Sequence, residues 1–158
     1  MKKPVKSCVV SSLEGKAFWQ PGVKGNCITV KISPWNVDKT NHTVFMHELP
    51  RGGKVGEHAH NENEEIFICL EGEGVIFIDG IENSFKKFDV AYLAPKTMHS
   101  IQNIGNDPLK FMVVISPTGL EERLKLMGRA KQDANELPPE GFENPLAKLE
   151  SHGVVRKS

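Results

Sequence analysis

The sequence predicts a mainly β protein, built as a small antiparallel β-barrel or jelly roll with helices near its carboxy-terminal end. Two observations support this fold class. Before Pro117, short apolar segments alternate with turn residues at the spacing typical of strands in sandwiches and barrels. After Pro117, the apolar residues recur at the helical period instead. The change of period predicts a β body followed by a helical end.

The strands follow from the apolar pattern in chain order. Ile28, Val30 and Ile32 alternate with polar residues, which is the period of a half-buried strand, and 43–49 continues this pattern. The segment 66–70 is apolar on both faces, as expected for a strand enclosed between two layers. Asp79-Gly80 tolerates the positive φ of a tight hairpin turn. Further strands are expected at 75–78, 82–85, 90–93, 100–104 and 109–115.

Two helices are expected after the strands. Thr118 and Glu121 have the spacing of a capping box, and apolar residues then recur at helical spacing to about Ala134. A break at 137–141 precedes a short helix at 145–152. We therefore expect residues 1–117 to form the barrel with an amino-terminal extension. Residues 118–158 would form a helical appendage that is not an independent domain.

Charge and apolar content exclude several classes of partner. The chain has 20 Lys plus Arg and 20 Asp plus Glu, so no overall field attracts nucleic acid or an anionic membrane. Its longest apolar stretches are far below the roughly 18 residues that span a bilayer. The three cysteines lack the close pairing of zinc or redox motifs, which fits a reducing compartment. We expect a cytoplasmic protein that binds neither nucleic acid nor membrane.

A cluster of ligand-type residues predicts a metal site. On a strand, His58 and His60 would point to the same face, about 6–7 Å apart at the backbone. Glu64 or Glu65 follows, and His99 lies close to a later predicted strand. Three neutral imidazoles and one carboxylate suit Fe, Mn, Ni, Cu or Zn rather than Ca or Mg. Four protein ligands also leave positions open for a substrate.

The same residues resemble the first motif of the cupin superfamily, G(X)5HXH(X)3,4E(X)6G. The chain reads GGKVGEHAHNENEEIFICLEG from Gly52 to Gly72 and matches every fixed position. The second motif, G(X)5PXG(X)2H(X)3N, is partly kept, because Phe88 replaces its first glycine and the spacing before His99 is one residue shorter. The resemblance covers roughly residues 27–115.

The resemblance implies a cupin barrel that holds one divalent transition metal ion on His58, His60, Glu65 and His99. Glu65 would be the metal ligand because it keeps the motif spacing, and Glu64 is the alternative. The activity implied first is that of a metal-dependent dioxygenase, resembling quercetin dioxygenase-like cupins, with Glu65 as the catalytic proton carrier. Two alternatives are a non-redox metal isomerase or lyase and a non-catalytic cupin that binds a small molecule. The resemblance also implies a homodimer.

The remaining histidines, the aromatic residues and the lysines are expected to have structural rather than ligand-binding roles, with a few exceptions. His47 is expected to be a surface or hydrogen-bonded strand histidine, with a place in the barrel as the alternative. Phe67 and Cys69 share the face of Glu65 on their strand, so both are candidates to line the pocket. Tyr92 is expected in the core or pocket wall. We also expect no Lys or Arg close to the ligands, since the nearest cations, Lys54 and Lys96, are expected to face solvent, and this argues against a phosphorylated sugar as substrate.

Overall fold

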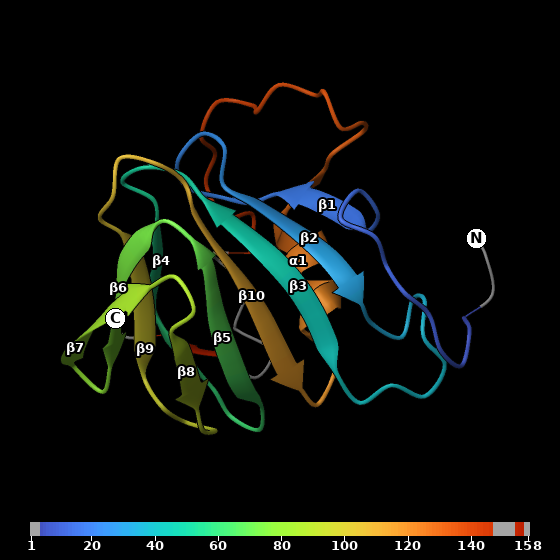
Figure 1. The fold of residues 1–158 in the computed structure, drawn as a ribbon, viewed down its shortest axis with the longest axis horizontal. Helices are drawn as coiled ribbons and strands as arrows, with labels where there is room; N and C mark the ends of the chain where they lie inside the picture. Colours follow the sequence, from blue (N-terminus) through green and yellow to red (C-terminus); the bar gives the residue numbers. More distant parts are fainter. Residues whose placement is uncertain (1–3, 147–153, 157–158) are drawn as a thin grey trace.

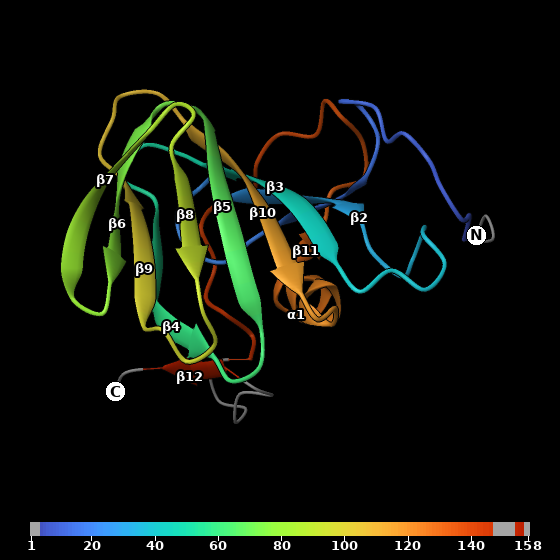
Figure 2. The same cartoon turned by 60° about the horizontal axis from the view of Figure 1, so that its bottom comes forward.

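The computed structural model describes residues 4–146 and 154–156. Within this part of the chain, two antiparallel sheets pack as two layers (Figures 1 and 2). One sheet has seven strands in the order β11-β1-β2-β3-β10-β5-β8, and the other has five in the order β12-β4-β9-β6-β7. The elements are β1 Lys16–Trp19, β2 Cys27–Ile32, β3 Thr43–Leu49, β4 Lys54–His60, β5 Glu64–Glu71, β6 Glu73–Ile78, β7 Ile81–Lys86, β8 Val90–Leu93, β9 His99–Asn103, β10 Leu109–Ser116, α1 Leu120–Met127, β11 Arg129–Ala130 and β12 Val154–Arg156.

The predicted fold class is confirmed, and most predicted strands lie where the apolar pattern placed them. The segments 43–49 and 90–93 match β3 and β8 at both ends. Asp79 and Gly80 both have positive φ and join β6 to β7, as the predicted hairpin requires. The described residues contain no helix with the length and apolar character needed to cross a bilayer.

The interior is formed by alternate residues of β3, β5 and β10. Directly opposite residues of neighbouring strands point to one face, so they form rows across the sheet. One row joins Thr43, Ile115 and Glu65, and another joins His47, Phe111 and Cys69. The first row therefore holds the predicted carboxylate ligand. The second lies four residues away along the strands.

The predicted first helix is shorter than its apolar pattern suggested. α1 ends at Met127 rather than near Ala134, because Arg129 and Ala130 form the strand β11, which pairs with β1 instead. The capping box is wrong in part, since the N-cap is Gly119 and makes no side-chain cap. The carboxylate of Glu121 instead accepts hydrogen bonds from the Gly119 N–H and the Thr43 hydroxyl, which ties the helix to β3.

Near its end, the chain contributes one more strand to the barrel. The helix predicted at 145–152 lies mostly outside the described residues, and Pro145 and Leu146 form a turn. The backbone of β12 then pairs with β4 opposite 58–60, a strand that the sequence did not predict (Figure 2). Within the described residues, the segment expected to be helical thus contains the short helix α1 and the strands β11 and β12.

We expect a chain ending at Glu136 to keep a folded barrel. The hydrophobic core cluster extends no further than Met127, and the Trp19 indole still donates to Glu136. The truncation removes the exposed ion pair between Lys24 and Glu140, which contributes at most about 1 kcal/mol, and the strand β12, which lies at the edge of its sheet. Thermal unfolding followed by circular dichroism should remain one cooperative transition. A broad, non-cooperative transition would show that residues 137–158 belong to the core.

Candidate metal site

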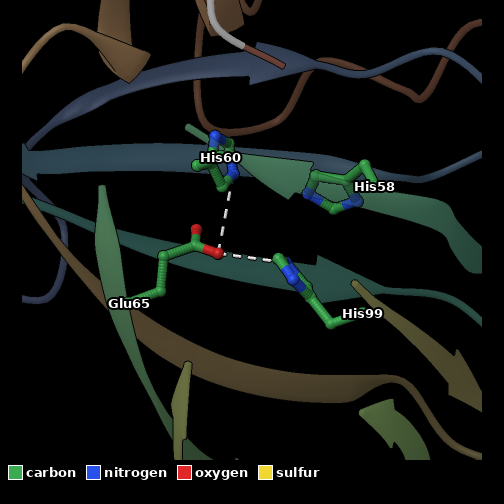
Figure 3. Close-up of side chains that lie close together, drawn as sticks. All are labelled: His58, His60, Glu65 and His99. Atoms are coloured by element: carbon green, nitrogen blue, oxygen red, sulfur yellow. Dashed lines mark ion pairs between the residues drawn. The ribbon is translucent and has the colours of Figure 1, made fainter. Parts of the chain in front are cut away.

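The two sheets bring together His58, His60, Glu65 and His99. His58 and His60 extend from β4, and His99 opens the neighbouring β9 directly opposite His58. Glu65 comes from β5 of the other sheet. One ligand atom from each of the four residues lies within 4.8 Å of the others. Figure 3 shows the Glu65 carboxylate pointing toward the rings of His60 and His99.

Backbone contacts fix the orientation of two of the imidazoles. Nδ1 of His58 lies 2.8 Å from the carbonyl oxygen of Gly56, and Nδ1 of His99 lies 2.9 Å from that of Thr97. Because a carbonyl oxygen only accepts, each Nδ1 carries the proton and donates it. When such a ring is neutral, its Nε2 therefore has a free lone pair. This arrangement is typical of metal-binding histidines.

The polar atoms of the cluster are buried without sufficient protein partners. His60, Glu65 and His99 are 5%, 3% and 3% exposed. Nε2 of His60 and His99 lies 3.5 Å and 3.0 Å from Oε2 of Glu65, yet none of these three atoms makes a well-oriented hydrogen bond to a described residue. Leaving buried polar atoms unsatisfied costs about 1–3 kcal/mol each. Their position and chemistry fit a divalent transition metal ion.

Burial and mutual contacts set the protonation of the cluster. Burial, together with the charges of His99 and His60, lowers the pKa of His58 to about 4. Burial also lowers the pKa of His60. Burial alone would raise the pKa of Glu65, but its contact with His99 and the nearby imidazoles lowers it overall. Glu65 is therefore ionised at neutral pH, and His58 and His60 are neutral, as metal binding requires.

The structure distinguishes between the two carboxylates that the sequence left open. Glu65 points into the barrel, whereas Glu64 is exposed and accepts a hydrogen bond from the Tyr92 hydroxyl at 2.8 Å. Neighbouring residues on a strand face opposite sides, which explains the difference. Tyr92 was expected in the core or pocket wall, and this is wrong, because it lies on the same outer face as Glu64.

The candidate metal site opens into a cavity of about 600 Å³ between the sheets. Phe67 lines this cavity as expected, but Cys69 is buried in the core and is not among its lining residues. Most of the wall is apolar, and α1 closes part of it with Leu120 and Leu124. The apolar lining residues from the strands are Ile28, Phe45, Val55, Phe67, Ile101, Phe111 and Val113. Such walls exclude water and favour an apolar or aromatic ligand.

Several polar residues line the cavity besides the candidate ligands, and sequence reasoning missed Arg123 among them. Because Arg123 lines it, the expectation of no cation close to the ligands is wrong, whereas Lys54 also lines it but is exposed to solvent, as expected. Arg123 lies on α1, close enough to His60 for its charge to lower the pKa of that imidazole. His47 is a buried strand histidine that is hydrogen-bonded to Asn26, which agrees with one of the expectations for it, and it also lines the cavity, which was the alternative. The pattern of β3 already placed His47 on the same face as Phe45, which was the available signal.

Comparison with known proteins identifies one domain. The family model described as "Cupin domain" matches residues 45–115. The chain is 41% identical over 68 residues to the Oxalate-binding protein of Thermotoga maritima, covering 43% of this chain and 56% of that protein. It is 28% identical over 85 residues to Quercetin 2,3-dioxygenase of Bacillus subtilis, covering 54% of this chain and 25% of that enzyme. The chain thus spans less than two thirds of either relative.

A solved structure gives the same fold over a larger part of the chain. The crystal structure of a predicted oxalate decarboxylase from Thermotoga maritima matches with a TM-score of 0.63 and 29% sequence identity. The match covers 70% of this chain and 100% of that one. It therefore extends well beyond the residues that the family model matches.

Proposed function

Residues 45–115 of this chain form a cupin domain, and from this we propose that the protein is a metal-dependent enzyme of the dioxygenase type, acting on a small organic substrate. The observation that carries the proposal is the cluster of three imidazoles and one carboxylate at the wall of an apolar cavity. A bound Fe, Mn, Ni or Cu ion would supply Lewis acidity and redox chemistry at this point.

The chain's own residues would divide the work at the site. His58, His60 and His99 would hold the ion through nitrogen lone pairs, and Glu65 would add a negative charge. Glu65 would also accept a proton from substrate at its carboxylate oxygen, since a basic group within reach of substrate serves as general base. The aromatic wall, including Phe67 and Phe111, would hold the substrate and exclude water.

Cavity size favours a substrate larger than a two-carbon acid. A volume of about 600 Å³ lies within the range of pockets that enclose drug-sized ligands, and its wall is mostly apolar. Oxalate would leave most of this volume to water in contact with apolar side chains. An aromatic substrate with adjacent oxygen atoms would fill it and present those oxygens to the ion. The relative named Quercetin 2,3-dioxygenase supports this class of chemistry.

The second candidate function is binding of a small carboxylate without turnover. Lys54 and Arg123 line the cavity, and cationic side chains favour an anionic ligand. A curated relative is named Oxalate-binding protein, which supports the same ligand class. In this function the bound metal ion and the side chains of Lys54 and Arg123 would all contact the same carboxylate ligand. A non-redox isomerase or lyase is a third candidate, with the ion polarising a carbonyl group.

Oxygen uptake separates these candidates. Metal-free protein is loaded separately with Fe, Mn, Ni, Cu or Zn and mixed with catechols, flavonols and keto acids while dissolved oxygen is recorded. We expect uptake with a redox-active ion and an aromatic substrate, and none with Zn. Oxalate binding by calorimetry without any oxygen uptake would favour the binding function. Substrate conversion without oxygen would favour the isomerase or lyase.

Three further expectations belong to the proposal. A homodimer is supported by exposed apolar side chains at and beside the edge strand β8, namely Phe88, Val90 and Tyr92. Covering them with a second copy would remove apolar surface from water. A cytoplasmic location is supported by the free cysteines, Cys8, Cys27 and Cys69. A small-molecule substrate, rather than nucleic acid or membrane, remains the proposed partner.

A further inference from the structure

A second polar group lies in the cavity, away from the candidate metal site. His47 on β3 is 5% exposed, and its Nε2 lies 2.7 Å from Oδ1 of Asn26, which is itself 6% exposed. Nδ2 of Asn26 donates to the carbonyl oxygen of Pro21 at 2.8 Å. That contact fixes the amide, so its oxygen faces the imidazole. His47 and Asn26 both line the cavity.

The fixed amide determines the chemistry of His47. Because Oδ1 of Asn26 accepts, Nε2 of His47 carries the proton, and Nδ1 of the neutral ring keeps a lone pair. Burial lowers the pKa of His47 to about 3, so the ring stays neutral at any working pH. A neutral imidazole held in this tautomer accepts a hydrogen bond at Nδ1. It matches a hydroxyl group and disfavours a carboxylate.

A series of neighbouring aromatic rings extends from His47 to the candidate metal site. The ring centroids of His47 and Phe111 lie 4.9 Å apart. Those of Phe111 and Phe67 lie 5.6 Å apart, and those of Phe67 and His99 lie 6.0 Å apart. The rows of His47 and Glu65 are four residues apart, which is about 13 Å along the strands. The two polar groups therefore lie at opposite ends of an aromatic wall.

We propose that His47, positioned by Asn26, is a specificity-determining residue that accepts a hydrogen bond from a hydroxyl group at the far end of an elongated aromatic ligand. The near end of this ligand presents oxygen atoms to the candidate metal site. The inference rests on the proposed function for that near end and names the substrate class of the same cavity. Lys54 and Arg123 also line the cavity and would favour the oxygen-bearing end.

The test compares two probes that differ by one hydroxyl group. Zn-loaded protein is titrated by calorimetry with 6-hydroxy-2-naphthoate and with 2-naphthoate, whose carboxylate serves as the metal-binding end. The wild type should bind the hydroxylated probe about tenfold more tightly, which corresponds to one additional hydrogen bond. His47→Phe keeps the ring and removes the acceptor, so the ratio should fall to about one. His42→Gln, at an exposed histidine outside the cavity, should keep the tenfold ratio.

A second variant covers the case in which His47→Phe does not fold. In Asn26→Asp the carboxylate stabilises a protonated His47, which turns Nδ1 from an acceptor into a donor. The preference for the hydroxylated probe should then fall, and 2,6-naphthalenedicarboxylate should bind more tightly than it binds the wild type. Thermal unfolding confirms that each variant is folded.

Three results would overturn the inference. They are no binding of either naphthoate to the wild type, a wild-type ratio near one, and a tenfold ratio that survives in a folded His47→Phe or Asn26→Asp protein. These outcomes are separate from failure of the proposed function. Oxygen uptake without hydroxyl preference would remove only the role of His47. Hydroxyl preference in Zn-loaded protein, with no uptake for any redox-active ion, would remove only the dioxygenase proposal.

Discussion

Replacement of both His58 and His60 by Ala is expected to abolish stoichiometric metal binding. The two imidazoles are half of the four-residue cluster, and Glu65 and His99 alone leave two ligands. Structural zinc sites with four ligands are worth about 10–16 kcal/mol, so two lost ligands lower affinity by on the order of 10⁴-fold or more. Metal per protomer is measured by elemental analysis after loading and desalting.

The matched control replaces a histidine outside the cluster. His42 is exposed in the segment before β3, so His42→Ala should keep full metal content. The double variant should still unfold cooperatively, since neither His58 nor His60 belongs to the hydrophobic core cluster. Stoichiometric metal in the folded double variant would show that the ion binds elsewhere.

Glu65→Gln is expected to retain metal at saturating concentration but to lose about 10²-fold or more of turnover. The amide keeps the size of the side chain and one oxygen ligand, yet it removes the negative charge and the basicity. A general base typically contributes 10²–10⁴-fold to a rate, which sets this magnitude. Oxygen uptake is measured against metal content for the same preparation, so a loss of catalysis is separated from a loss of metal.

Glu64→Gln provides the matched control for this prediction. Glu64 precedes Glu65 in the chain but lies on the outer face, where it accepts a hydrogen bond from Tyr92. Its variant should keep both metal and turnover. Full turnover in Glu65→Gln together with inactive Glu64→Gln would assign the role to the other carboxylate. Parallel losses of metal and of ligand affinity in Glu65→Gln, with no turnover in the wild type, would instead indicate a binding protein.

The fold class could be predicted from local spacing, whereas the set of four candidate ligands also required the resemblance to the cupin motifs, because His99 lies far from His60 in the sequence. The alternation in 43–49 fixes which residues of β3 face the interior, and that face is the same wherever the strand pairs. His58 and His60, two residues apart, share a face on any strand. Asp79-Gly80 favours positive φ whatever surrounds it. Choosing Glu65 over Glu64 required the motif spacing in addition to the strand period.

The residues that sequence reasoning missed depend on contacts between distant segments. α1 ends at Met127 because the edge of β1 offers backbone partners to Arg129 and Ala130, and no local pattern encodes that pairing. Arg123 reaches the cavity only because the helix is fastened to β3 through Glu121. Local spacing thus determined the strands and ligand types, whereas the closure of the cavity was decided by tertiary packing, since its walls come from both sheets and the helix.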